Sequence, residues 1–152
     1  MTPKYVFEEI KEYIPRGKTI WMPFYGDGKK AGQNMKELGF DVIHQPEDFW
    51  SYDRGDIVVD NPPFEKKKEI ITELIRRGKP FMLIVPCSTI CYNYAKILKE
   101  NVQLIIPRKR PKFIKYDKIT RELDPDWHKR SVPFDCLWVC YKINLKNDIN
   151  FA

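Results

Sequence analysis

The feature that most constrains the fold is a series of short, continuous apolar runs separated by segments of helical periodicity. The runs cover residues 19–24, 41–43, 57–60, 81–85 and 102–106. In the longer runs the apolar side chains stand at successive positions instead of alternating with polar ones. This pattern is typical of parallel strands that are buried on both faces by helices. The sequence therefore predicts an α/β fold.

The segments between these runs have the features of helices. Residues 65–77 repeat apolar side chains on one helical face and are followed by Gly78, a residue suited to ending a helix. Residues 30–38 are predicted to be helical as far as Gly39, and residues 90–100 to form a further helix. Helices in these places provide the crossovers that consecutive parallel strands require.

The two ends of the chain and one charged segment complete the prediction. Thr2 is expected to cap a helix whose first turn holds Pro3. The apolar face of that helix is formed by Val6, Ile10 and Ile14. Residues 116–132 carry charges without a clear period and are predicted to form a mobile loop. The alternation in residues 135–143 is compatible with an edge or hairpin strand, and we expect residues 1–152 to form a single domain.

The composition narrows the class of protein. Of the 152 residues, 43% are apolar and 14% aromatic, enough for a core that buries about 70% of the unfolded surface. The sequence shows neither a signal peptide nor an apolar stretch of membrane-spanning length. We therefore expect a cytoplasmic, nuclear or viral-factory protein that is neither secreted nor membrane-bound. A net charge of +6 favours a polyanionic partner such as nucleic acid.

The four cysteines form two pairs, and three residues separate the members of each pair. Cys87 and Cys91 make the first pair, and Cys136 and Cys140 the second. Structural zinc sites usually have tighter knuckles with two intervening residues, placed in loops. Because Cys136 and Cys140 fall in a strand-like segment and Cys87 follows an apolar run, we expect buried thiols. The sequence thus predicts neither a metal site nor a disulfide.

The tetrapeptide Asn61-Pro62-Pro63-Phe64, shortly after the run at 57–60, indicates chemistry on an amino group attached to a planar ring. Such an amine is a weak nucleophile, and accepting hydrogen bonds from both of its hydrogens draws the nitrogen toward a tetrahedral, more reactive shape. The Asn61 side-chain oxygen and the Pro62 carbonyl oxygen are suitable acceptors. The prolines fix φ and set the direction of that carbonyl, and Phe64 offers a stacking surface. The alternative is an ordinary turn that ends a strand.

Two further segments fall beyond the carboxyl ends of predicted strands, where doubly wound sheets bind their ligands. The segment 23–28, Pro-Phe-Tyr-Gly-Asp-Gly, has glycines that allow a tight turn and a close approach of a ligand to backbone amides. Asp48 and Phe49 place a carboxylate beside an aromatic ring, a pair able to bind an adenine amine. A plain strand-to-helix turn and a solvated loop carboxylate are the alternatives for these two segments.

In order and spacing these segments resemble the compact Dam-like N6-adenine methyltransferases found in phages and, more broadly, the class I S-adenosylmethionine-dependent methyltransferases. The resemblance covers nearly the whole chain. It implies a Rossmann-like, mostly parallel sheet with helices on both faces, one strand-helix unit being shortened, and S-adenosylmethionine as cofactor. It assigns catalysis to Asn61, Pro62, Pro63 and Phe64. It assigns cofactor binding to Thr2, Pro3, Pro23, Phe24, Tyr25, Gly26, Asp27, Gly28, Asp48, Phe49 and Asn61.

Two positions depart from the pattern of that family. Met22 stands where an acid is expected at the start of the glycine motif, so the ammonium group of the cofactor needs another partner. Asp27 is the candidate that the segment offers. The second departure is His44-Gln45-Pro46, which follows the second predicted strand in place of the acid that usually holds the ribose hydroxyls.

The resemblance implies methyl transfer to the N6 amine of adenine in nucleic acid, with DNA favoured over RNA. Two basic runs are expected to contact that substrate, although a charge run is often only a solvated face. They comprise Lys66, Lys67 and Lys68, and Arg108, Lys109, Arg110 and Lys112. Cys87 after Pro86 is disfavoured as a covalent nucleophile by its place in the chain. RNA adenine or protein glutamine methylation, a cofactor-free nucleic-acid-binding module and an unrelated nucleotide-binding protein remain open, as do homo- and hetero-oligomers.

Overall fold

The structure, a computed structural model, describes most of the chain. The described residues are 1–26, 29–91, 102–114, 120 and 135–152. Asp27 and Gly28 lie outside them, as do nearly all of the helix predicted at 90–100 and of the loop predicted at 116–132. No helix in the described ranges is long and apolar enough to cross a membrane.

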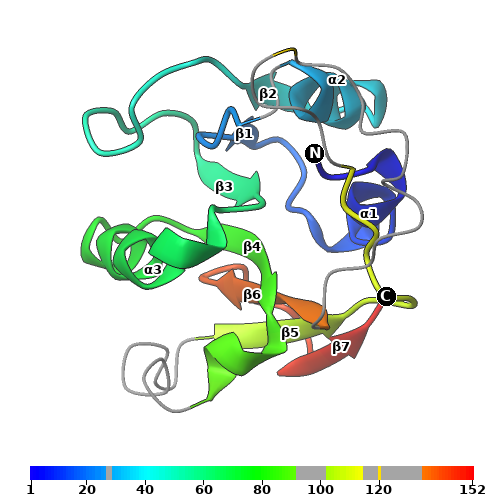
Figure 1. The fold of residues 1–152 in the computed structure, drawn as a ribbon. Coiled ribbons are helices and arrows are strands. Elements are labelled where there is room, and N and C mark those ends of the chain that lie inside the picture. Colours follow the sequence, from blue (N-terminus) through cyan, green and yellow to red (C-terminus); the bar gives the residue numbers. More distant parts are fainter. Residues whose placement is uncertain (27–28, 92–101, 115–119, 121–134) are drawn as a thin grey trace.

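A sheet of seven strands forms the centre of the described part of the molecule, in the order β2-β1-β3-β4-β6-β5-β7 (Figure 1). Its strands are β1 (Thr19–Trp21), β2 (Asp41–Ile43), β3 (Ile57–Asp60), β4 (Phe81–Pro86), β5 (Val102–Ile106), β6 (Cys136–Tyr141) and β7 (Ile149–Phe151). Strands β1 to β4 pair in parallel, β6 is antiparallel to β4 and β5, and β7 is parallel to β5. The predicted, mostly parallel sheet is confirmed.

Helices cover both faces of this sheet. The helices α1 (Lys4–Glu8) and α2 (Lys30–Glu37) lie on one face, and α3 (Lys67–Arg76) lies on the other (Figure 1). All residues of β3 and β4 are buried because alternate side chains enter opposite halves of the core. This two-sided burial explains the continuous apolar runs, and the predicted doubly covered, Rossmann-like architecture is confirmed.

The two longer helices match their predictions closely. In α3 the side chains of Ile70, Ile71 and Leu74 are buried against the sheet. A 3-10 turn, η2 (Phe64–Lys66), precedes this helix. After α2 and α3 come Gly39 and Gly78, with φ of +93° and +66°, the left-handed conformation that glycine adopts without strain.

The beginning of the chain differs from the prediction. Pro3 is the residue before α1, in an extended conformation, and no side chain caps this helix, so the predicted capping role of Thr2 is wrong. The helix ends at Glu8, and a 3-10 turn, η1 (Lys11–Tyr13), follows. The three predicted face residues, Val6, Ile10 and Ile14, are nevertheless all buried. Thr2 itself is 3% exposed, because its side chain lies inside the molecule instead of at a helix end.

The end of the chain also differs. The strand predicted as an edge or hairpin strand, β6, lies between β4 and β5, and all six of its residues are buried. The edge is formed instead by β7, which the sequence did not predict. Asn150 on β7 is buried and its side-chain amide donates to the carbonyl of Leu104 at 3.1 Å. Tertiary contacts of this kind, and not local apolar periodicity, hold this short strand in place.

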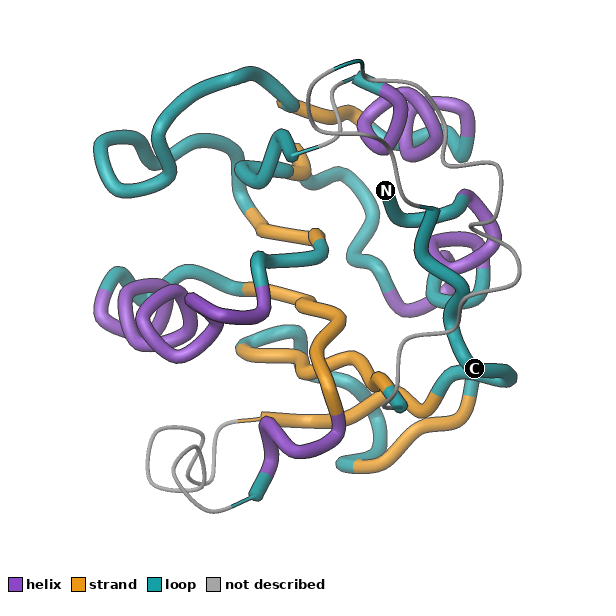
Figure 2. The backbone as a smooth tube through the Cα atoms, in the orientation of Figure 1, coloured by secondary structure: helices purple, strands orange, loops and turns teal. Residues whose placement is uncertain are grey.

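The chain order reverses next to β1. After β2, residues 44–56 contain neither helix nor strand and lead to β3 on the other side of β1 (Figure 2). This direct connection is the shortened strand-helix unit that was predicted. Strand β1 ends at Trp21 instead of Phe24, because Pro23 has no N–H to continue the ladder. The adjacent carboxyl ends of β1 and β3 therefore form a topological switch point, the usual ligand site of such sheets.

Candidate functional site

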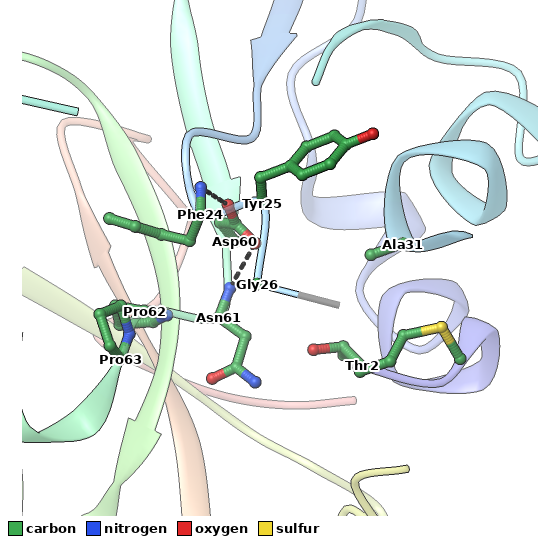
Figure 3. Close-up of a pocket in the computed structure, with 10 residues that line it drawn as sticks. Thr2, Phe24, Tyr25, Gly26, Ala31, Asp60, Asn61, Pro62 and Pro63 are labelled. Carbon is green, nitrogen blue, oxygen red and sulfur yellow. Dashed lines mark hydrogen bonds between the residues drawn. The ribbon is translucent and has the colours of Figure 1, made fainter. Parts of the chain in front are cut away.

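A pocket of about 330 Å³ lies at this switch point. Its walls come from the segments that follow β1 and β3, from the start of the chain and from α2. The lining residues are Met1, Thr2, Phe24, Tyr25, Gly26, Ala31, Asp60, Asn61, Pro62 and Pro63 (Figure 3). The tertiary structure thus brings Thr2, the glycine segment and the tetrapeptide together, although they are far apart in the sequence.

Asn61 and Pro62 supply the β3 side of the pocket. The Asn61 carboxamide is directed into the pocket, toward Thr2 (Figure 3). Its Oδ1 atom is buried and has no hydrogen-bond partner among the described residues. Leaving such an acceptor unpaired costs about 1–3 kcal/mol. A buried, unpaired acceptor on a residue that lines a pocket is explained most simply by a ligand that donates to it.

Phe64 does not line this pocket. It begins the turn η2, is partly buried, and packs at the border of the core. Its ring meets the edge of the Phe113 ring, with the two centroids 6.1 Å apart and the planes at 76°. Phe113 directly follows the basic run at 108–112, so the end of that run is brought beside the tetrapeptide. The stacking role of Phe64 stays a prediction.

Phe24, Tyr25 and Gly26 supply the β1 side. The Phe24 ring lies 5.3 Å from that of Phe49, and the Tyr25 ring 4.7 Å from that of His44, measured between centroids. Gly26 is exposed, and a Cβ placed on it would meet nothing within 4 Å. The backbone at Gly26 is therefore open to close approach by a ligand, as the sequence predicts.

Asp60 is the residue of this site that the sequence analysis missed. Its carboxylate is 3% exposed and lines the pocket between the two loops. The backbone N–H of Phe24 donates to Oδ2 at 2.9 Å, and that of Asn61 donates to Oδ1 at 2.8 Å (Figure 3). Burial raises the pKa of Asp60 to about 8, although the two backbone hydrogen bonds act in the opposite direction. The available signal was an acid at the end of an otherwise apolar strand.

His44 occupies the position where the acid after the second strand is missing. Its Nδ1 lies 2.8 Å from the carbonyl oxygen of Met22 and so connects the end of β2 to the end of β1. The ring packs closely on α2, because a Cβ on Gly32 would come within 2.6 Å of its Cδ2. A second hollow of about 340 Å³ lies beyond Tyr25 and is lined by Tyr25, Lys29, Gly32, Gln33, Lys36, His44, Gln45 and Pro46.

Four of the described residues that were predicted to bind the cofactor do not line the main pocket. Phe49 is 5% exposed and packs between Trp21 and Phe24, under the guanidinium group of Arg77. Asp48 is exposed and accepts a hydrogen bond from the Ser51 hydroxyl at 2.6 Å. Two others, Pro3 and Pro23, are buried beside lining residues. The cofactor-binding roles of these four residues stay predictions.

The two basic runs lie on different sides of the tetrapeptide. Lys66 and Lys68 are exposed at the start of α3, and the Lys67 ammonium group donates to the carbonyl of Phe64 at 3.3 Å. The run at 108–112 packs against α1. In it the Lys112 backbone N–H donates to the Tyr5 hydroxyl at 2.8 Å, and Lys109 Nζ lies 4.7 Å from the centre of the Tyr5 ring. Arg110 pairs with Asp135 at 2.7 Å.

The cysteines follow the prediction only in part. Cys136 and Cys140 are buried on β6, and burial raises the pKa of each thiol to about 12. Cys87 is partly exposed, and Cys91 is exposed, contrary to the expected burial, because the chain leaves the core in a 3-10 turn after β4. In the part of the chain that the structure describes, no group of metal-ligating side chains is found.

Comparisons with known proteins give one relative and several distant structures. No family model matches the chain. The type II methyltransferase M.EcoRI of Escherichia coli is 28% identical, over 88% of this chain and 46% of that protein. The chain therefore spans about half the length of this relative.

Among solved structures, the precorrin-6y C5,15-methyltransferase of Geobacter metallireducens has a TM-score of 0.49 at 13% identity, covering 93% of this chain and 89% of that one. A SAM-dependent O-methyltransferase of Thermotoga maritima has a TM-score of 0.44 at 14% identity, covering 93% and 66%. Likenesses at this level carry no argument about function.

Proposed function

We propose that this protein transfers a methyl group from S-adenosylmethionine to the N6 amine of adenine in nucleic acid, DNA being the favoured substrate. The observation that carries the proposal is the buried, unpaired Oδ1 of Asn61 in the pocket at the switch point. Similarity to a type II methyltransferase over most of the chain supports it. The resemblance of the tetrapeptide to the motif of amino-group methyltransferases points in the same direction.

The pocket suits the proposed cofactor in size and chemistry. Its volume of about 330 Å³ falls within the range of about 300–1,000 Å³ typical of small-molecule sites. The lining is mainly apolar, and its polar groups include the Thr2 hydroxyl, the Tyr25 phenol and the Asp60 carboxyl group beside Asn61. When bound, the cofactor supplies a methyl group on a positively charged sulfur. A carboxylate in the lining fits a ligand of that charge.

In the proposed mechanism the protein orients and polarises the amine of the target base. Asn61 Oδ1 and the Pro62 carbonyl oxygen accept hydrogen bonds from its two hydrogens and draw the nitrogen lone pair out of the ring. The two prolines hold the Pro62 carbonyl in place before substrate arrives. No strong side-chain base is required, because the amine proton becomes acidic once the nitrogen has become cationic. Phe64, with Phe113 beside it, provides aromatic surface for the base.

The basic runs would hold the backbone of the substrate. Lys66 and Lys68 are exposed directly after the tetrapeptide, and the segment 108–112 ends beside Phe64 through Phe113. Phosphates on either side of an extracted base would then meet cationic side chains from two sides.

The pKa of Cys87 is raised, mainly by burial, so this residue is a thiol at neutral pH. A thiol disfavours covalent attack on cytosine and favours amine methylation.

The test compares wild type with Asn61→Ala, using Asn147→Ala as control because the Asn147 side chain lies on an exposed surface. Both variants and wild type are supplied with S-adenosylmethionine and with DNA, RNA or protein, and mass spectrometry locates the added methyl group. We expect methyl on adenine N6 in DNA, a loss of about 100-fold or more in Asn61→Ala, and unchanged turnover in the control.

Calorimetry on the same proteins separates the cofactor from the chemistry. Asn61→Ala is expected to bind S-adenosylmethionine within about twofold of wild type. Full turnover by Asn61→Ala would overturn the mechanism. Methyl found on RNA or on glutamine would change the substrate but keep the amine chemistry. No binding by wild type at millimolar cofactor would favour a nucleic-acid-binding module that keeps the fold without the activity.

A further inference from the structure

Asp60 supplies the only carboxylate among the described residues that line the pocket. It is the last residue of β3, and its two oxygens accept hydrogen bonds from the Phe24 and Asn61 backbones. Asp60 therefore lies between the loop after β1, which is part of the proposed cofactor site, and Asn61, which is proposed to bind the target amine. Met22, where an acid is expected, is fully buried and apolar. The pocket thus has its negative group on β3 instead of at the end of β1.

We propose that Asp60 is the counter-charge of the cationic cofactor and that it loses a proton when the cofactor binds. The proposal rests on the proposed function, because it takes S-adenosylmethionine as the ligand. It replaces Asp27, which the sequence suggested as partner of the cofactor's ammonium group. The proton moves from the Asp60 carboxyl group to solvent, and the positive charge of the ligand takes its place in the pocket.

Among the described residues, the surroundings of Asp60 provide no cationic side chain that pairs with its carboxyl group. On β4 its partner is Leu83, and all six residues of that strand are apolar. The loop after β1 contributes Phe24 and the phenol of Tyr25. Met1 also belongs to the lining, and its α-amino group donates to the carbonyl of Ile114. Burial raises the pKa of Asp60 and the two backbone hydrogen bonds lower it, and no charged side chain in the described part of the chain adds to these effects.

A cation that enters this pocket shifts the Asp60 carboxyl group from its neutral form toward its ionised form. An opposite charge within about 4–6 Å favours the ionised carboxylate by one to three pKa units. The ionised carboxylate accepts stronger hydrogen bonds than the neutral acid. The bonds to Phe24 and Asn61 are therefore expected to strengthen when the cofactor binds, and cofactor binding would fix the position of Asn61.

The first measurement uses wild-type protein alone. Calorimetric titration with S-adenosylmethionine in buffers of different ionisation enthalpy gives the number of protons released. We expect about 0.4 to 0.9 protons at pH 7, because the pKa of Asp60 in the free protein is about 8 and the charge of the ligand lowers it by about one to three units. For the same reason the dissociation constant should fall as pH rises from 6 to 8, by up to about tenfold per pH unit, and then level off.

The second measurement compares Asp60→Asn with Asp56→Asn. Asp56 precedes the same strand, is exposed, and accepts a hydrogen bond from the Thr19 backbone at 2.8 Å, so it matches Asp60 without touching the pocket. Asp60→Asn should release no proton and bind with an affinity independent of pH. Asp56→Asn should behave as wild type. Circular dichroism and thermal melting confirm that both variants are folded.

The outcomes distinguish this inference from the proposed function. Proton release by wild type that is lost in Asp60→Asn and kept in Asp56→Asn supports the role of Asp60. Binding with the same affinity and no proton release from pH 6 to pH 8 overturns that role and leaves the proposed function standing. If Asp60→Asn does not fold, the wild-type proton count decides alone. No binding by wild type at pH 8 overturns the proposed function, and the inference with it.

Discussion

The two sides of the pocket are held in place in different ways. The β3 arm, residues 61–64, is stiffened by its own covalent structure, because two consecutive prolines fix the backbone. The β1 arm, residues 22–26, is held from outside. The Asp60 carboxyl group accepts a hydrogen bond from the Phe24 backbone N–H, and Nδ1 of His44 lies 2.8 Å from the carbonyl oxygen of Met22. The Met22 N–H in turn donates to the carbonyl of Ile43 at 2.9 Å.

This difference explains which half of the site a sequence reveals. A rigid segment carries its conformation in its own residues, so the β3 arm stands out as a motif. The β1 arm depends on side chains that are distant in the sequence, so its own residues do not reveal its conformation.

The largest effect is expected from Asp60, whose carboxyl group is hydrogen-bonded to the backbone of both arms, on the free energy of unfolding. The pKa of Asp60 is about 8 in the folded protein, against 3.8 for an aspartate that is unperturbed. Between these values the folded state holds a proton that the unfolded state has lost. The free energy of unfolding should therefore fall as pH rises from about 4 to about 8, by up to about 1.4 kcal/mol per pH unit.

Urea titrations from pH 5 to pH 8 measure this slope. Asp60→Asn should remove this part of the pH dependence, whereas Asp56→Asn should keep it. Glu73 does not interfere in this window, because hydrogen bonds from Arg76 and Arg77 lower its pKa to about 2 and its effect appears only at acid pH. Equal slopes in wild type and Asp60→Asn would show that the carboxyl group is ionised in the free protein.

A smaller effect on stability is expected from a substitution that displaces His44, one of the residues that hold the β1 arm. In Gly32→Ala the new Cβ would lie 2.6 to 2.8 Å from His44 Cδ2, Cβ and Cγ, so the ring must move away from the Met22 carbonyl. Overpacking of this kind costs about 1–3 kcal/mol. Thermal melting should show the loss, and calorimetry should show weaker cofactor binding because the β1 arm shifts.

Gly26→Ala is the matched control for that variant, since its Cβ meets nothing within 4 Å. Its melting temperature should equal that of wild type. If a ligand does approach the backbone at Gly26, cofactor affinity should fall even so. Melting temperatures that are lowered equally in both variants would contradict the view that His44 supports the β1 arm.

The smallest effect is expected in the β3 arm. Pro63 is exposed and has φ of −61°, a conformation that alanine also adopts. Pro63→Ala should therefore lower the free energy of unfolding by only about 0.4–1 kcal/mol, through the greater freedom of the unfolded chain. Turnover should fall more than cofactor affinity, because the Pro62 carbonyl is less firmly directed. An equal loss in both would show that this arm also holds the cofactor.

Several parts of the fold could be predicted because their cause is local. The apolar runs at 57–60 and 81–85 became β3 and β4, and the amphipathic segment at 65–77 became η2 and α3. Other parts depended on distant partners. The alternation at 135–143 indicated an edge strand, yet β6 is central because β5 and β7 lie beyond it.

The site shows the same division. The sequence singled out Asn61, Pro62 and Gly26, and these line one pocket. It did not predict that Phe49 would pack beneath Phe24, because the path of residues 44–56 is set by contacts such as those of Arg77 with the Phe49 carbonyl. It also did not identify Asp60, whose importance comes from its burial between two loops.

The sequence by itself determined the α/β class, the covered sheet and the stiffness of the segment 61–63, because periodicity and proline act over a few residues. Only the tertiary structure decided that β6 is central, that His44 and Asp60 hold the β1 arm, and that the pocket has its carboxylate on β3. Burial is the physical reason for this division. The charge state of a carboxyl group and the partners of a loop depend on residues that only folding brings together.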